Sequence, residues 1–165
     1  MPRTFPVTSS LNNLINYTYL QQQFVGNRFY VGKNIATGAD SENYGRQPDN
    51  PFLTLDYAIG RCTANNGDII YLLPGHSETI GAANAIDVDV AGLTIIGLGQ
   101  GTGRPTITLD TAVTASIRIN ADNITIDNLL ILGGIDNLTT VLTIDAQVDI
   151  TLRNIEYRDS VGQCA

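Results

Sequence analysis

Apolar and polar residues alternate in short stretches over most of the chain after Glu78. Four stretches have period two, a pattern that buries one face of an extended strand and leaves the other in water. Two apolar runs nearer the N-terminus, at 29–31 and 68–73, also predict strands, the second ended by a Pro-Gly turn. The alternating stretches are Ile86–Val90, Thr106–Leu109, Ile117–Ile119 and Leu142–Ile144. The chain after Glu78 is therefore expected to be all β.

A phrase of nine residues recurs among these strands. Asn123-Ile-Thr-Ile-Asp-Asn-Leu-Leu-Ile131 returns as Asp149-Ile-Thr-Leu-Arg-Asn-Ile-Glu-Tyr157, and more loosely as Gly92-Leu-Thr-Ile-Ile-Gly-Leu-Gly-Gln100. The three starts lie 31 and 26 residues apart, within the range of periods found in stacked repeat proteins. The phrase therefore predicts an all-β solenoid with a unit of about 25 residues.

Aligning the phrases predicts which side chains stack. Ile95 is expected over Ile126 and Leu152, and Leu98 over Leu129 and Ile155. Successive units then run in the same direction, so their strands should pair in parallel around a narrow aliphatic core. An antiparallel β-sandwich is the alternative, but the chain has few of the two-residue hairpin turns that such a fold requires.

A helix is expected near residues 54–65, just before the first predicted strand of the repeats. Leu55, Ala58, Ile59 and Cys62 have helical spacing, and the Asn65-Asn66-Gly67 sequence supplies a left-handed stop. A helix at this position is predicted to cap the open end of the stacked core. Residues 26–165 then form one domain, with this helix at its start.

Residues 1–25 do not belong to the repeat and are predicted to form an N-terminal arm. Part of the arm has an approximately helical apolar stripe, followed by a Gln-rich end. Two interpretations stay open, a packed or frayed terminal helix and an arm that docks on a partner, because termini not tied to a core are usually mobile. The predicted interface residues are Leu11, Leu14, Ile15, Tyr17, Tyr19 and Phe24.

Charge and composition narrow the partners of this 165-residue chain. Its formal net charge is −7, so we expect no binding to nucleic acid or to an anionic membrane, since the summed field repels phosphate. The first 25 residues have no apolar segment behind a basic one, and no apolar stretch approaches the roughly 18 residues of a membrane span. We therefore expect a protein that is made in the cytoplasm and is neither secreted by this route nor membrane-spanning.

Three motifs between residues 29 and 78 carry a resemblance. They are Phe29-Tyr-Val31, Pro51-Phe-Leu-Thr-Leu-Asp-Tyr-Ala-Ile59 and Gly67-Asp-Ile-Ile-Tyr-Leu-Leu-Pro-Gly75. Together they resemble the opening of the right-handed parallel β-helix proteins, the pectate-lyase-like superfamily. Within that superfamily the chain is most similar to short virion proteins of tailed phages, in which Gly-His-Ser-Glu follows the Pro-Gly turn, here Gly75-His-Ser-Glu78. The resemblance implies a fold, while the activities in this superfamily range from lyases and hydrolases to no catalysis.

No catalytic, cofactor-binding or metal-binding residue is predicted. The carboxylates after residue 86 mostly occupy outward or turn positions, and Asp127 and Arg153 are expected to form an ion pair between adjacent repeats. His76 is the single histidine of the chain and is predicted to lie with Ser77 and Glu78 in a solvated loop. No amphipathic helix follows Tyr157, so we expect either another chain or further residues to cover that end.

These features and the resemblance lead us to expect a non-enzymatic virion structural protein of a tailed bacteriophage, a decoration or cement protein on the outer capsid surface. Expected partners are copies of itself, most simply as a trimer, and the major capsid protein or another virion protein. The alternative is the N-terminal part of a tailspike or tail fibre that binds or degrades host polysaccharide. An adhesion module of the cell surface is a third possibility, disfavoured by the lack of a signal peptide.

Overall fold

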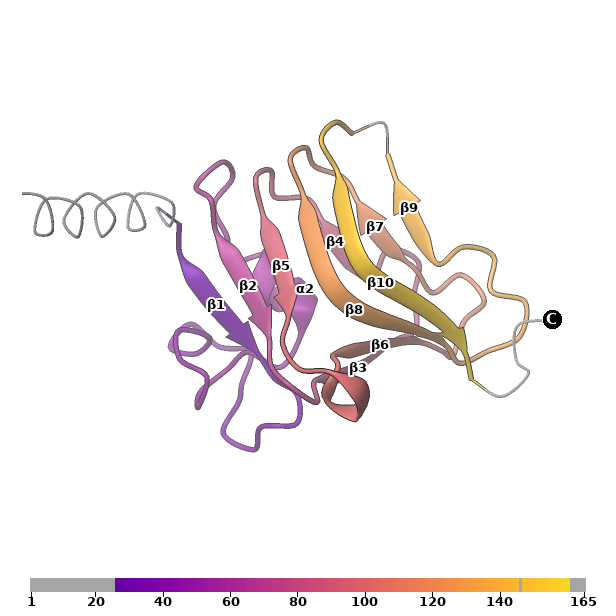
Figure 1. The fold of residues 1–165 in the computed structure, drawn as a ribbon, viewed down its shortest axis with the longest axis horizontal. Coiled ribbons are helices and arrows are strands. Elements are labelled where there is room, and N and C mark those ends of the chain that lie inside the picture. The colour runs from indigo at the N-terminus through magenta and orange to yellow at the C-terminus, as the bar shows by residue number, and fades with distance from the viewer. Residues whose placement is uncertain (1–25, 146, 161–165) are drawn as a thin grey trace, which may run out of the picture.

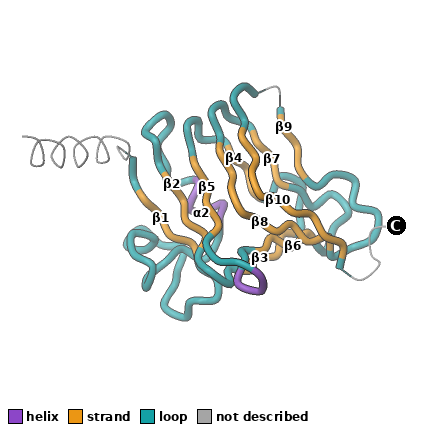
Figure 2. The backbone as a smooth tube through the Cα atoms, in the orientation of Figure 1, coloured by secondary structure: helices purple, strands orange, loops and turns teal. Residues whose placement is uncertain are grey.

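The computed structural model describes residues 26–145 and 147–160. Strands dominate these residues, and the only α helix among them is short (Figures 1 and 2). The helical elements are α2 (Leu55–Ile59) and the 3-10 turn η1 (Gly101–Gly103). The strands are β1 (Arg28–Val31), β2 (Ile69–Leu72), β3 (Ser77–Ile80), β4 (Ile86–Val88), β5 (Thr94–Gly97), β6 (Thr106–Leu109), β7 (Ile117–Ile119), β8 (Thr125–Gly133), β9 (Leu142–Ile144) and β10 (Thr151–Asp159).

All pairs between these strands are parallel. One sheet has the order β1-β2-β5-β8-β6-β3 with β10 also beside β8, and a second has the order β4-β7-β9 (Figure 1). β2 pairs with β5, β3 with β6 and β4 with β7, so these strands pair across repeats rather than with the strands next to them in the sequence. The described residues thus form mostly strands in parallel sheets with little helix, which is compatible with an all-β fold, and these strands contain none of the antiparallel ladders of a sandwich.

The register follows the repeat phrase. Ile70 pairs with Ile95, Ile95 with Ile126, and Ile126 with Leu152. The alignment of the phrases predicted the stacking of Ile95, Ile126 and Leu152. Ile155 pairs with Leu129 as predicted. Leu98 does not join the column of Leu129 and Ile155, because β5 ends at Gly97. The alignment of the phrase over residues 92–100 with the other two therefore holds only for its first half.

Each repeat begins at a residue with positive φ. Gly67, Gly92, Asn123 and Asp149 have φ values of 71°, 76°, 58° and 59°, and each lies two residues before a strand. Gly, Asn and Asp tolerate this left-handed region better than other residues. The first residue of the phrase differs between repeats, but each of these residues meets the same backbone requirement. It forms a turn that redirects the chain into β2, β5, β8 or β10.

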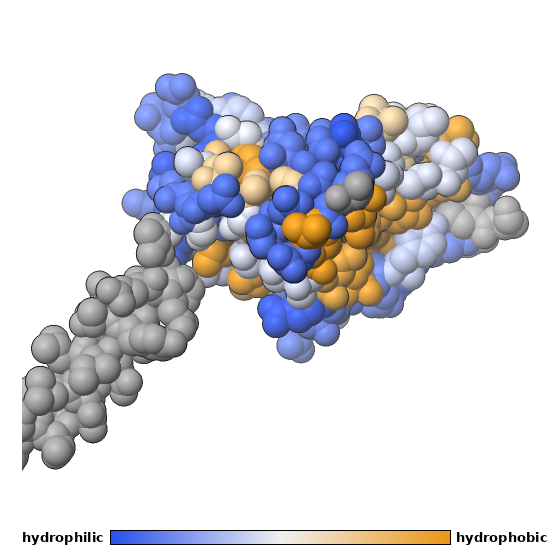
Figure 3. All heavy atoms as spheres, turned by 90° about the horizontal axis from the view of Figure 1, so that it is seen from above, coloured by the Kyte–Doolittle hydropathy of each residue, from blue (hydrophilic) through white to orange (hydrophobic). Residues whose placement is uncertain are grey.

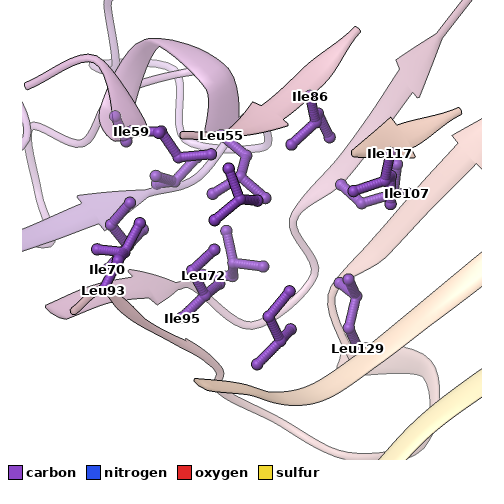
Figure 4. Close-up of a cluster of buried hydrophobic side chains, with 14 of the residues drawn as sticks. Leu55, Ile59, Ile70, Leu72, Ile86, Leu93, Ile95, Ile107, Ile117 and Leu129 are labelled. Atoms are coloured by element: carbon purple, nitrogen blue, oxygen red, sulfur yellow. The ribbon is translucent and has the colours of Figure 1, made fainter. Parts of the chain in front are cut away.

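The predicted helix over 54–65 is shorter than expected. α2 ends at Ile59, because the Thr63 N–H donates to the Asp68 carboxylate at 2.7 Å and Asn65 takes a φ of 56°, so the backbone leaves the helical path. α2 still buries its apolar side chains and packs against β1, β2 and β4 (Figure 4). The strand predicted at Ile86–Val90 also ends early, at Val88.

The core is a continuous column of aliphatic side chains between the sheets (Figure 4). At one end Phe29 and Phe52 join it, with ring centroids 5.8 Å apart. Along the column, inward positions of adjacent strands place Ile86 beside Ile117 and Ile70 beside Ile95. Parallel in-register pairing therefore brings like side chains together, and dispersion contacts between them accumulate along the stack.

Candidate functional site

A polar groove of about 640 Å³ lies where the chain bends between two halves of the larger sheet. β8 pairs through its first residues with β5 and through its last residues with β6, and β10 follows β8 through both halves. The outer side of this bend, the loop after β5 and η1 form the groove walls. They contribute Ile96, Gly97, Gln100, Gly101, Arg104, Asp127, Asn128, Asn154, Ile155 and Glu156.

Two asparagines produce the bend. Asn128 and Asn154 occupy equivalent places in β8 and β10, with φ values of 61° and 51°. The Asn128 side-chain amide donates to the carbonyl oxygens of Gly97 and Gly99, at 2.8 and 2.9 Å. The Asn154 amide donates to Asp127 Oδ1 at 2.8 Å. Asn suits these positions because it tolerates a left-handed backbone and supplies a donor to the neighbouring repeat.

Arg104 spans the groove and reaches the last strand. Its Nη1 lies 2.7 Å from Glu156 Oε2, and its Nη2 donates to the carbonyl oxygen of Asn154. The Nε of Arg104 is buried and has no hydrogen-bond partner among the described residues. The groove therefore presents mainly the amide groups on its walls to a ligand, while Glu156 and Asn154 hold the Arg104 guanidinium.

The groove carboxylates are paired with arginines. A hydrogen bond from Arg158 Nε at 2.5 Å, with the charge of Arg104, holds the pKa of Glu156 below its usual value. Asp127 Oδ2 lies 3.2 Å from Arg153 Nη2, the ion pair predicted from the repeat. An ionised, doubly paired Glu156 is a poor proton donor, so the groove suits binding of an oxygen-rich molecule better than acid catalysis.

A second charged row crosses β4 and β7 and ends at Asp145, directly after β9. Arg118 Nε lies 2.7 Å from Asp145 Oδ2, and Arg118 Nη1 lies 3.4 Å from Asp87 Oδ2. Burial raises the pKa of Asp87, with Arg118 acting in the opposite direction. The hydrogen bond to Asp145 raises the pKa of Arg118. This row is explained by cross-strand charge pairing on a partly exposed face.

His76 and Glu78 are buried, so the predicted solvated loop is wrong for both. His76 Nδ1 accepts a hydrogen bond from the Lys33 N–H at 3.1 Å, and Glu78 Oε2 accepts one from the Leu55 N–H at 2.9 Å. His76 Nε2 lies 3.4 Å from Glu78 Oε2 without hydrogen-bond geometry. Together the two side chains join the loop after β1 and the first turn of α2 to β3.

Register explains why this pair was missed. Glu78 pairs with Ile107, a buried inward residue, so Glu78 also points inward. A charged residue at an inward position has no apolar periodicity to reveal it, and the missed strand β3 (Ser77–Ile80) carries it. Glu78 and Ile80 are two residues apart and so lie on the same face of a strand. This spacing was the available indication that Glu78 points inward. Ser77, predicted in the same loop, is exposed as expected.

Asp68 is another buried polar residue, and one that the sequence did not single out. Its carboxylate accepts hydrogen bonds from the Asn27 N–H, the Thr63 N–H and the Asn66 amide, at 2.5, 2.7 and 2.7 Å. Burial, with the negative charge of Asp68, raises the pKa of the Cys62 thiol to about 12. Cys62 therefore stays a neutral thiol at physiological pH.

The end of the molecule at β9 and β10 exposes apolar side chains. Ile144, Val148, Leu152 and Tyr157 are 45%, 58%, 38% and 45% exposed. We call these four residues the β10 end face; apolar atoms reach the surface among polar ones in Figure 3. The predicted partner residues Leu11, Leu14, Ile15, Tyr17, Tyr19 and Phe24 lie outside the described residues.

Within residues 26–145 and 147–160, no three His, Cys, Asp or Glu side chains come close enough together to bind a metal ion. No helix in that part is sufficiently long and apolar to span a membrane. No family model, no curated protein and no solved structure matches the chain.

Proposed function

We propose that the chain is a right-handed parallel β-helix with α2 as the cap of its first coil. Support comes from the parallel, in-register pairing of β2, β5, β8 and β10 and from the turn residue of positive φ that precedes each of them. In this proposal each coil contributes one strand, or half of a bent strand, to each of three faces. The resemblance of residues 29–78 to the opening of such proteins agrees with it.

We further propose that the protein is a non-enzymatic structural component of a tailed-phage virion, a decoration or cement protein on the head shell. The observation that carries an assembly role is the asymmetry of the stack, which is covered by α2 at one end and exposes the β10 end face at the other. Exposed apolar surface of this kind marks contact sites in soluble proteins. The virion setting rests on the resemblance, and the net charge of −7 would keep the protein off packaged nucleic acid.

Location within the virion tests this role. Immunogold electron microscopy of purified particles should label the head shell over its whole surface. A particle that lacks the protein should lose head stability on heating or chelation, as expected when a cement is removed. Label restricted to the tail tip, together with depolymerase activity on host polysaccharide, would overturn the proposed role.

The arm of residues 1–25 is proposed to attach the protein to the particle through its apolar side chains. Replacing Leu11, Leu14 and Ile15 together with Ser should abolish binding to particles that lack the protein, while the β circular dichroism spectrum stays unchanged. The matched control replaces Asn12 and Asn13 with Ser in the same segment and should bind normally. Unchanged binding of the triple variant would refute the arm as the attachment site.

The polar groove favours one alternative, a tailspike or fibre fragment that binds host polysaccharide. Guanidinium and amide donors beside ionised carboxylates are groups that recognise sugar hydroxyls. Glycan-array binding that is lost in Arg104→Ala and retained in Arg118→Ala would support this alternative. Arg118 is a suitable control because it forms comparable ion pairs outside the groove.

A further inference from the structure

β10 is an edge strand that lacks several of the usual protections against pairing. In the described part of the chain β8 is its strand partner, and over residues 151–156 no strand lies along its other edge. Natural edge strands are commonly protected by Pro, Lys, a bulge or an inward charge. β10 contains neither Pro, Gly nor Lys, and its inward positions Leu152, Ile155 and Tyr157 carry no charge, while Asp159, which pairs with buried Gly133, lies at the end of the strand. Residues 151–156 therefore offer an edge to another strand.

The bend at Asn154 makes the pattern of β10 symmetric along its length. Leu152 pairs with buried Ile126 and Tyr157 with buried Ile131, so both point inward. Arg153 and Glu156 pair with Asp127 and Leu130, which are partly exposed on the outer face. A straight strand would place residues five apart on opposite faces, because side chains alternate. The left-handed Asn154 shifts this alternation and places Leu152 and Tyr157 on the same face.

This symmetry fixes the partner and its register. We propose that a second copy of this chain pairs its β10 antiparallel with the first, around a two-fold axis between Asn154 and Ile155. Leu152 then lies opposite Tyr157 of the other copy, and Arg153 opposite its Glu156, each contact occurring twice. Inward Leu152 meets inward Tyr157 and opposite charges meet on the outer face, while Asn154 lies opposite Ile155 at the axis. The proposal rests on the assembly role proposed above.

Neighbouring registers lack this complementarity. A shift by one residue places inward Leu152 opposite outward Arg158, and outward Arg153 opposite inward Tyr157. The favoured register also covers the β10 end face, so Leu152 and Tyr157 become buried in pairs. Apolar burial supplies most of the stabilisation, since side chains of Arg153 and Glu156 are 61% and 38% exposed and such ion pairs contribute little. The resulting oligomer is a dimer, which differs from the trimer expected from the sequence.

Sedimentation equilibrium of the full chain tests how many copies associate. A mass of twice 17.7 kDa is expected. Arg153→Glu should weaken the dimer about tenfold, because two attractive contacts become repulsive. The double variant Arg153→Glu with Glu156→Arg should restore it. Circular dichroism of each variant monitors folding. A monomer at all concentrations, or a trimer, overturns the proposal.

Disulfide trapping tests the register independently of these charges. In a background of Cys62→Ser and Cys164→Ser, an equimolar mixture of Arg153→Cys and Glu156→Cys chains should form a disulfide between copies, because paired residues in antiparallel strands lie about 4.5–5.5 Å apart. The matched control mixes Arg153→Cys with Arg158→Cys and should not cross-link. Cross-linking in the control alone overturns the register.

Two further outcomes identify other occupants. A dimer that disappears on deletion of residues 1–25, without cross-linking of the Arg153→Cys and Glu156→Cys chains, assigns the contact to the arm and overturns the β10 contact. A protein that binds the head shell and yet stays monomeric overturns the dimer and leaves the proposed virion role intact. A dimer formed by a protein that is restricted to the tail tip overturns the proposed role on the head shell and leaves the dimer intact.

Discussion

The two ends of the stacked core use similar side chains and differ in what lies beyond them. At the α2 end, Phe29, Phe52 and Ile59 are almost completely buried, and the ring centroids of Phe52 and Tyr57 lie 5.0 Å apart. At the β10 end, inward Leu152 and Tyr157 are partly exposed. Ile70 and Leu152 belong to one column of paired residues, yet Ile70 is 0% and Leu152 38% exposed. Burial in such a stack therefore depends on the presence of a next layer.

Polar residues differ between the ends in the same way. Near α2, buried Asp68 and Glu78 accept hydrogen bonds from backbone N–H groups, including those of the first helical turn and of the loop after it. Near β10, Glu156 and Asp127 meet arginines on an outer face. Buried acceptors compensate otherwise unsatisfied donors, whereas surface ion pairs contribute little to stability. The α2 end should therefore be the more sensitive to polar substitutions.

The largest expected difference between the ends comes from truncating one column of side chains. Ile95→Ala should lower the free energy of unfolding by about 4 kcal/mol, because a fully buried side chain leaves a cavity. Leu152→Ala should cost only about 1 kcal/mol in the monomer, since part of that side chain is already in water. Urea unfolding at low protein concentration measures both. Equal costs would contradict an open β10 end.

A smaller effect is expected from removing the buried carboxylate of Asp68. Asp68→Ala should lower the free energy of unfolding by about 3 kcal/mol, because three hydrogen-bond donors lose their acceptor. The same change removes a negative charge beside Cys62 and should lower its thiol pKa from about 12. Thiol alkylation against pH, in a Cys164→Ser background, measures the pKa.

Asp136→Ala is the matched control for Asp68→Ala, since Asp136 is exposed. Its cost should lie within about 0.5 kcal/mol of zero. A Cys62 pKa that does not fall in Asp68→Ala would contradict the assigned electrostatic contribution.

The next largest difference in unfolding free energy is expected between substitutions of the two bend asparagines, Asn128 and Asn154. Asn128→Ala should cost about 2 kcal/mol, since it breaks two hydrogen bonds and places Ala at positive φ. Asn154→Ala should cost about 1 kcal/mol, because that exposed residue makes one side-chain hydrogen bond, to Asp127. Thermal unfolding compares them. Asn128→Gly separates the causes, since Gly keeps the backbone conformation and removes only the amide. A cost in Asn128→Gly as large as in Asn128→Ala would assign it entirely to the hydrogen bonds.

The smallest effect is expected from the charge of Glu156. Its pKa is lowered in the folded state, chiefly by Arg158, so its stabilisation is complete above the ordinary Glu pKa of about 4.3 and is lost as pH falls through the lowered value. Glu156→Gln should therefore lower the melting temperature slightly at pH 7 and not at about pH 2. A difference that persists in acid would point to packing rather than charge.

Several parts of the fold were predictable because they are local. Strands β6, β7 and β9 have the bounds that the alternation predicted, since period-two patterning is set by neighbouring residues. The stacking of Ile95, Ile126 and Leu152, and the ion pair of Asp127 with Arg153, followed from aligning equal positions of a repeat. The length of α2 was not predictable in this way, because Asp68 ends the helix through a hydrogen bond from outside it.

The groove shows the limit of the same reasoning. Arg104 and Glu156 meet across 52 residues, and neither occupies a repeat position that predicts the other. The inward direction of Glu78 likewise depends on β3 lying beside β6.

By itself the sequence determined most of the strands, their parallel order and the residues at which each repeat turns, because side-chain periodicity and tolerance of positive φ are properties of short segments. The tertiary structure alone decided that His76 and Glu78 are buried, that Asn128 and Asn154 bend their strands into a groove, and that one end of the core is covered while the other is exposed. These features depend on which distant segments lie beside a residue, and that neighbourhood exists only in the folded chain.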